Sequence, residues 1–250
     1  MRLIEALILL TLLLSASTLF VNAERRPVWL RGIPVITLIL VLLHVWVEGA
    51  RWQLVPAYGL TGIFAVLGFA AWRTPTHSAS QSDRKWLRLS GAVCSLILIG
   101  ITAAGATALP VFQLPEPSGA YAVGTQKLLL EDKDRPEVIT EDPDDHRDLA
   151  VRVWYPADSQ DASKRMSYMP SEEAVAFARK YGLPPFTTSH LSLVETHAFE
   201  GAPVAEDQPE YPVLLFSHGY NVPPSIYASL LPEIVSHGFI IFAVNHTYES

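Results

Sequence analysis

The sequence has 250 residues, of which half are hydrophobic and only 17% are charged. Its charges are unevenly distributed: residues 1–110 contain nine Lys or Arg and four Asp or Glu, whereas residues 111–250 contain nine and 21. An acidic region that follows an apolar one argues against nucleic acid as a partner. Cys94 is the single cysteine, which excludes a framework of disulfides within the chain.

Four apolar runs, at residues 3–21, 33–47, 55–72 and 87–109, predict that residues 1–110 form a region of four transmembrane helices. A helix needs about 20 mostly apolar residues to cross the bilayer core, with a range of about 17–25. The second run reaches this length only if the residues just before it are included. Tryptophans, which favour the membrane interface, stand at the ends of the runs: Trp29, Trp46, Trp52, Trp72 and Trp86. We therefore expect the lipid bilayer to be a partner.

Basic residues predict the orientation of these helices. The loops after the first and third runs hold seven of them: Arg25, Arg26, Arg31, Arg73, Arg84, Lys85 and Arg88. The opposite side has only Arg2 and Arg51. Because Lys and Arg gather in cytoplasmic loops, we expect a multi-pass membrane protein whose acidic domain lies outside the cytoplasm. The first run could instead be a signal peptide cleaved near Ala23, but the Arg-rich third loop would then lie outside.

His44 and Glu48 lie four residues apart at the end of the second run and would share one helix face. An ionisable pair inside a membrane is a functional candidate by default. Both residues stand where interfacial water can reach them, so the sequence alone assigns them no role and predicts no metal site.

Residues 111–118 form a predicted Pro-rich linker, which is extended because proline interrupts helices. Strands are predicted at residues 123–131 and 149–155, the second ended by Pro156. The acidic segment between them lacks the spacing of an EF-hand calcium loop. We expect it to be the solvated loop of a hairpin.

A helix is predicted over residues 171–180, with Ser171 as its N-cap and Gly182 at its end. The following segment, residues 187–208, is irregular except for a possible short strand at 193–198.

Residues 212–216 and 239–244 are continuous apolar runs of the kind that forms fully buried strands. A helical stretch at 226–237 separates them, and Pro232 should kink this helix or delay its start. Strand, helix and strand at this spacing predict a βαβ unit with parallel strands.

The loop after the first of these strands reads Ser217-His218-Gly219-Tyr220. Such a loop lies at the carboxyl edge of a parallel sheet, where ligands bind. Gly219 permits a positive φ and a close approach of backbone to ligand. A backbone N–H exposed there can stabilise a developing oxyanion.

The segments YPVLLFSHGY and YASLLPEIVSHGFIIFAVNH, with YAVGTQ, VRVWYPA and YMPS upstream, resemble the platelet-activating factor acetylhydrolase family of α/β-hydrolases. The resemblance covers roughly residues 119–250. It implies the first part of an α/β-hydrolase fold with a mostly parallel sheet. It also implies that the Tyr220 N–H is one donor of the oxyanion hole, with Gly219 in the same loop. The implied activity of the full-length product is that of a membrane-anchored serine esterase or lipase. Its substrates would be short-acyl phospholipids or similar small esters, and no cofactor or metal ion is expected.

The catalytic triad is expected beyond residue 250. No G-x-S-x-G occurs in the chain, and triad residues in this fold follow the order Ser, Asp, His. Ser217 and His218 are then loop-shaping residues, and His237 and His246 come too early. We therefore expect these 250 residues alone to be inactive. Two alternatives stay open: a non-enzymatic membrane module with a hydrolase-like binding domain, and an esterase of the dienelactone or polyester type.

Overall fold

The computed structural model describes residues 1–21, 27–73, 81–142, 144–158, 164–220 and 222–246. The chain divides into two compact units: Met1–Val111 with Leu183–His190, and Phe112–Gly182 with Leu191–Ser250. Several residues used above lie outside the described part, namely Ala23, Arg25, Arg26 and the side chains of Trp72, Arg73 and Arg84.

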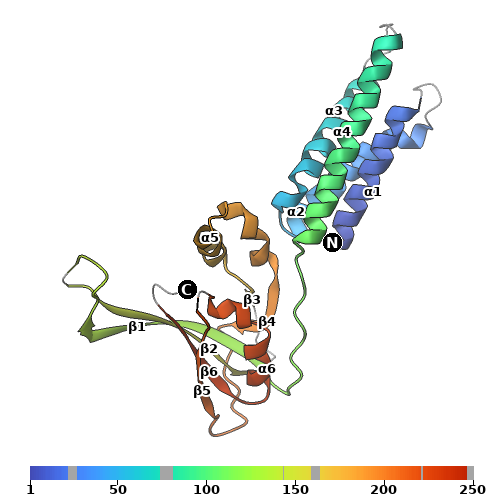
Figure 1. Cartoon of the computed structure of the whole chain (residues 1–250). Coiled ribbons are helices and arrows are strands. Elements are labelled where there is room, and N and C mark those ends of the chain that lie inside the picture. The colour runs from blue at the N-terminus through green and yellow to red at the C-terminus, as the bar shows by residue number, and fades with distance from the viewer. Residues whose placement is uncertain (22–26, 74–80, 143, 159–163, 221, 247–250) are drawn as a thin grey trace. The chain divides into compact units, whose positions relative to one another are not determined.

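Four α-helices make up most of the first unit: α1 (Leu3–Ser17), α2 (Ile33–Val47), α3 (Val55–Arg73) and α4 (Gln81–Ala108) (Figure 1). The 3-10 turns η1 (Thr18–Phe20), η3 (Val28–Gly32) and η4 (Trp52–Leu54) lie next to their ends. Proline is tolerated in these helices because Pro34 and Pro56 stand in the first turn, where an N–H has no helical partner. All four helices are long and apolar enough to cross a membrane, over Leu3–Phe20, Trp29–Val47, Trp52–Ala70 and Lys85–Ala108.

The four helices are apolar on their inner and their outer faces. Ile8 and Leu12 of α1 are fully buried and pack with Phe64 of α3 in one core cluster. Large apolar side chains also point outward, and Leu42 and Val66 are 61% and 68% exposed. A helix that is hydrophobic all round is typical of a membrane span or of the core of a large protein.

A six-stranded sheet forms the centre of the second unit. Its strands are β1 (Ala122–Pro136), β2 (His146–Ala157), β3 (Arg165–Ser167), β4 (Glu195–Glu200), β5 (Val213–Ser217) and β6 (Ile240–Asn245). Their order is β3-β4-β1-β2-β6-β5.

The prediction of a mostly parallel sheet is wrong, because the described strands form a mixed sheet. Only β1 with β4 and β5 with β6 are parallel. β1 and β2 form a long hairpin, which extends away from the rest of the sheet in Figure 1. Since this hairpin reverses the chain, β6 pairs with β2 in antiparallel fashion.

Two expectations about strand ends need correction. Pro156 does not end β2 but pairs with Val123, and its carbonyl accepts a hydrogen bond from the Ala205 N–H at 2.9 Å. Strand β6 pairs with β2 only as far as Trp154. At Pro156, β2 therefore has a single strand neighbour, and the backbone N–H that proline lacks is not needed to pair with a second strand. The acidic segment is not loop throughout, because β1 continues to Pro136 and β2 begins at His146. The shorter stretch between them closes the hairpin, and Glu137 there forms an ion pair with Arg147 of β2 at 2.9 Å.

The helices of this unit largely follow the predicted pattern. Helix α5 spans Ser171–Lys180, but its N-cap is Pro170, so Ser171 is the first helical residue rather than the cap. Gly182 follows it with a φ of 67°. The prediction that Pro232 delays the next helix is confirmed, because η7 (Pro224–Tyr227) comes first and α6 begins at Leu230 and ends at Ser236. The remaining 3-10 segment, η6, spans Pro185–Leu193.

The core of the second unit lies between the sheet and α6. Trp154 and Ile241 pack there against Leu231 of α6, and all three are almost fully buried. Strand β5 does not share this burial: Val213 is 57% and Leu215 is 82% exposed. The expectation of a fully buried strand is therefore wrong for β5, because it is the edge strand of the described sheet.

Candidate functional site

The loops that follow β5 and β6 emerge at the same edge of the sheet. These strands are parallel, with Ser217 in register with Val244. The chain therefore leaves both strands at their carboxyl ends, which is where ligands bind in sheets of this kind.

His218 links the two loops. Its side chain is 7% exposed, and its Nε2 accepts a hydrogen bond from the His246 N–H at 3.2 Å. Its Nδ1 lies 2.9 Å from the carbonyl oxygen of Gly219. An acceptor at one nitrogen and a donor at the other require the neutral ring with its proton on Nδ1. The rings of His218 and His246 also pack against each other, with centroids 4.8 Å apart.

Gly219 is held by Tyr227. The Gly219 N–H donates to the Tyr227 hydroxyl at 3.3 Å, and the Tyr227 ring packs edge-on against Phe216 with centroids 4.9 Å apart. A Cβ at position 219 would lie 3.3 Å from that hydroxyl. Gly219 is not among the glycines with positive φ. Glycine therefore allows the close approach of the Tyr227 hydroxyl at this position. Its tolerance of a positive φ, also expected to matter at Gly219, is not used.

Tyr220 follows Gly219 in the same loop and is exposed to solvent. The residue is 80% exposed, and among the described residues its N–H and its phenol have no hydrogen-bond partner. An N–H left unused beside a braced loop is available to an anionic oxygen.

Sequence reasoning missed a contact between Ser217 and His246. The Ser217 hydroxyl oxygen lies 2.7 Å from Nε2 of His246. Chain order had set His246 aside, but order along the chain does not measure distance in space. The available signal was that both residues end adjacent parallel strands. Ser217 closes β5, whereas the nucleophile of this fold occupies a sharp turn between a strand and a helix.

A cavity of about 470 Å³ lies beside the end of β6 and the start of η7, and its walls include Arg152 of β2, Glu173 of α5, Ser225 and Asn245. The described residues 217–220 are not part of its walls. This volume lies within the range of about 300–1,000 Å³ that is usual for small-molecule sites. Burial raises the pKa of the Glu173 carboxyl, against the opposing effects of a hydrogen bond from the Ser225 hydroxyl and of the Arg152 charge. Burial lowers the pKa of the Arg152 guanidinium. The sequence did not single out this pair as part of a cavity.

Comparison with protein families decides the relationship. Residues 106–250 match the family described as platelet-activating factor acetylhydrolase, isoform II. The match covers more than half of the chain. The chain belongs to this family. The resemblance seen in the sequence is thereby confirmed at the level of the family, and the match begins in the last turn of α4, before the start expected from the sequence.

Curated relatives in the platelet-activating factor acetylhydrolase family are similar over the same part of the chain. The platelet-activating factor acetylhydrolase of Canis lupus familiaris is 27% identical over 139 residues, which is 54% of this chain and 28% of that protein. The Cavia porcellus protein of the same name is 28% identical over 142 residues, which is 55% of this chain and 29% of that protein. The chain thus spans less than a third of the length of these relatives.

Among solved structures, the chain is similar to a ferulic acid esterase from Streptomyces cinnamoneus. The sequence identity is 26% and the TM-score is 0.45, over 56% of this chain and 38% of the esterase.

Proposed function

We propose that this chain is the N-terminal part of a membrane-anchored serine ester hydrolase. Membership of the platelet-activating factor acetylhydrolase family supports ester hydrolysis as the reaction class. Short-acyl phospholipids or related small carboxylic esters are the proposed substrates, in keeping with the names of the relatives.

The observation that carries the proposal is the Tyr220 N–H at the carboxyl edge of β5, which has no hydrogen-bond partner among the described residues. We assign it as one donor of the oxyanion hole, with Gly219 and Tyr227 holding the loop. The second donor would be the N–H that follows the nucleophilic Ser. The cavity beside Pro224 and Ser225 is the proposed place of the ester.

The proposed mechanism divides the work between this chain and the sequence beyond residue 250. A Ser on a G-x-S-x-G turn attacks the ester carbonyl carbon while a His takes its proton, and the carbonyl oxygen becomes an anion. The Tyr220 N–H stabilises that anion, the alcohol leaves with the proton, and water then releases the acyl group. One oxyanion donor contributes about 10²–10³ in rate.

Membrane anchoring is part of the same proposal. Four helices of sufficient length and apolar character support it. So do the exposed rings of Trp29, Trp46 and Trp86 at helix ends, which suit a membrane interface. We place the hydrolase domain outside the cytoplasm, on the asymmetry of basic residues between the loops.

The test compares these 250 residues with a product extended through a downstream G-x-S-x-G turn. Turnover of p-nitrophenyl acetate is measured for both, before and after treatment with a serine-reactive fluorophosphonate. The extended product should hydrolyse the ester and lose this activity on treatment, and it should prefer phospholipids with a short sn-2 acyl chain. The 250-residue chain should stay at background. An extended product that folds, binds ester analogues and never turns them over would instead support a binding module.

A further inference from the structure

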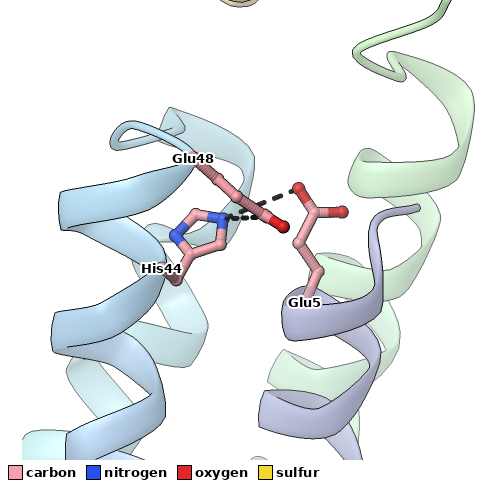
Figure 2. Close-up of side chains that lie close together, drawn as sticks. All are labelled: Glu5, His44 and Glu48. Carbon is pink, nitrogen blue, oxygen red and sulfur yellow. Dashed lines mark ion pairs between the residues drawn. The ribbon is translucent and has the colours of Figure 1, made fainter.

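Three ionisable side chains meet at one end of the helical unit, in a cluster distinct from the hydrolase site. Glu5 comes from the first turn of α1, and His44 and Glu48 come from the last turn and the C-cap of α2. Their ligand atoms all lie within 4.8 Å of one another. Figure 2 shows the His44 ring facing both carboxylates, from Nε2 to Glu5 Oε1 at 3.7 Å and to Glu48 Oε2 at 3.5 Å.

The cluster contains buried polar atoms that lack a hydrogen-bond partner. The His44 side chain is fully buried, and among the described residues neither its Nε2 nor the Glu48 Oε2 has such a partner. Buried polar atoms are nearly always paired, because an unpaired one loses its interactions with water without replacement. Two unpaired atoms that face each other across 3.5 Å therefore indicate room for a shared ligand.

The separations distinguish a metal ion from a proton. If His44 shared a proton with either carboxylate, the N–O distance would be about 2.7–2.9 Å, the value for charge-assisted hydrogen bonds. Ligands of a tetrahedral zinc ion lie about 2.0–2.1 Å from the metal, which places neighbouring ligand atoms about 3.3 Å apart. The observed 3.5 and 3.7 Å lie closer to the second value.

The surroundings of the cluster match those of a metal-binding histidine. The Tyr58 hydroxyl of α3 lies 3.1 Å from Nδ1 of His44, which holds the ring with Nε2 toward the carboxylates. Partners of this kind on the second ring nitrogen orient metal-binding histidines in proteins. Arg51 binds Glu5 Oε1 and offsets one of the two carboxylate charges. Arg2 brings a second positive charge to the cluster, since its guanidinium donates to the Glu48 carbonyl oxygen at 2.9 Å. The case for a metal ion therefore rests on the unpaired ligand atoms and their separations rather than on a surplus of negative charge.

We propose that Glu5, His44 and Glu48 bind a divalent transition-metal ion, with Zn²⁺ as the best match. One imidazole and two carboxylates are suitable zinc ligands, whereas Mg²⁺ and Ca²⁺ prefer oxygen alone. The Glu48 side chain is 16% exposed, so the ion can enter past it and keep a solvent molecule as its fourth ligand. The ion joins α1 to α2 at the end of the unit where Arg51 also binds the carbonyl oxygen of Leu109, just after α4.

Metal binding to the full 250-residue chain in lipid nanodiscs tests this proposal. The chain is stripped with EDTA and titrated with Zn²⁺ by calorimetry, and with Co²⁺ by visible absorption, which reports four-coordinate geometry. The wild type should bind one equivalent of Zn²⁺ that His44→Gln does not bind. His146→Gln is the matched control, because His146 is a partly exposed histidine of the hydrolase domain and should not affect this equivalent.

Two further variants keep the test decisive if His44→Gln fails to fold. Glu48→Gln removes a ligand from the accessible side of the cluster and should abolish the four-coordinate Co²⁺ spectrum. Tyr58→Phe should keep one equivalent but weaken its affinity about 10–100-fold, the usual effect of losing such a partner. The proposal is overturned if the wild type binds no equivalent that the His44 or Glu48 variant lacks, or if Tyr58→Phe leaves the affinity unchanged.

Discussion

The hydroxyl of Ser217 and Nε2 of His246 lie 2.7 Å apart, and this contact joins the carboxyl ends of β5 and β6. A hydrogen bond from a serine hydroxyl to a histidine is also the contact that activates a nucleophilic serine. The surrounding contacts favour a structural role, because the His246 N–H is bonded in turn to the buried ring of His218. We interpret Ser217, His218 and His246 as a brace that holds the oxyanion loop.

Labelling with a fluorophosphonate separates the brace from a nucleophile. The 250-residue chain should show no covalent labelling, and Ser217→Ala should give the same result, because Ser217 closes a strand and does not occupy the sharp strand-to-helix turn of a nucleophile. Intact-mass spectrometry provides the measurement. Labelling of the wild type that disappears in Ser217→Ala would make Ser217 the nucleophile and would overturn the loop assignment.

Substitutions at Tyr220 test the backbone role in the extended, active product. Tyr220→Phe should keep most of kcat, because the backbone N–H remains and the exposed phenol has no described partner. Tyr220→Pro should lower kcat about 10²-fold or more, since proline has no N–H to donate. Equal damage from both changes would assign the function to the phenol instead.

Topology is tested by a reporter enzyme that works only in the cytoplasm, fused after Pro117. We expect no reporter activity, because the basic residues place the end of the fourth helix outside. The same reporter fused between α3 and α4 should be active. Reversed activities would place the hydrolase domain in the cytoplasm.

The pH dependence of stability tests the environment of Glu173. Burial raises the pKa of its carboxyl above the ordinary value of 4.5, so the native state holds the proton more tightly than the unfolded state. This contribution is full below pH 4.5 and is lost as pH rises through the raised pKa. Glu173→Gln cannot titrate, so its stability relative to the wild type should improve steadily over that window. Thermal unfolding at a series of pH values measures the difference, and a difference independent of pH would argue against a raised pKa.

Gly124 is required by a close contact within the hairpin. A Cβ at this position would lie 2.3 Å from the ring of Tyr155, whose hydroxyl is fixed by a bond to the Ala202 carbonyl at 2.8 Å. Gly124→Ala should lower the free energy of unfolding by about 1–3 kcal/mol through overpacking. Gly100→Ala, where nothing lies within 4 Å of the new methyl group, is the control and should cause no such loss. Chemical denaturation compares the two variants.

Local features of this protein were predictable, and pairings between distant segments were not. Helix α5 follows from its charges and from Gly182, and the apolar helices follow from continuous runs of side chains. The hairpin of β1 and β2 joins neighbouring segments and was also expected. The pairings of β6 with β2 and of β4 with β1 depend on which distant strands meet, and hydrophobic pattern does not encode this. The same limit hid the metal cluster, since His44 and Glu48 share a helix but Glu5 approaches from 39 positions before His44.

The position of β5 has a consequence for the order of events during synthesis. Its only neighbour among the described strands is β6, which the ribosome makes after a further 22 residues, 218–239. At about 5–20 residues per second, the apolar segment Val213–Ser217 waits for roughly 1–4 s with no strand to join. The hairpin of β1 and β2 can form long before, so β6 docks onto a finished edge and brings β5 with it. A destabilising substitution in β6 would therefore leave both β5 and β6 unpaired on the nascent chain, whereas one in β5 would leave only β5 unpaired.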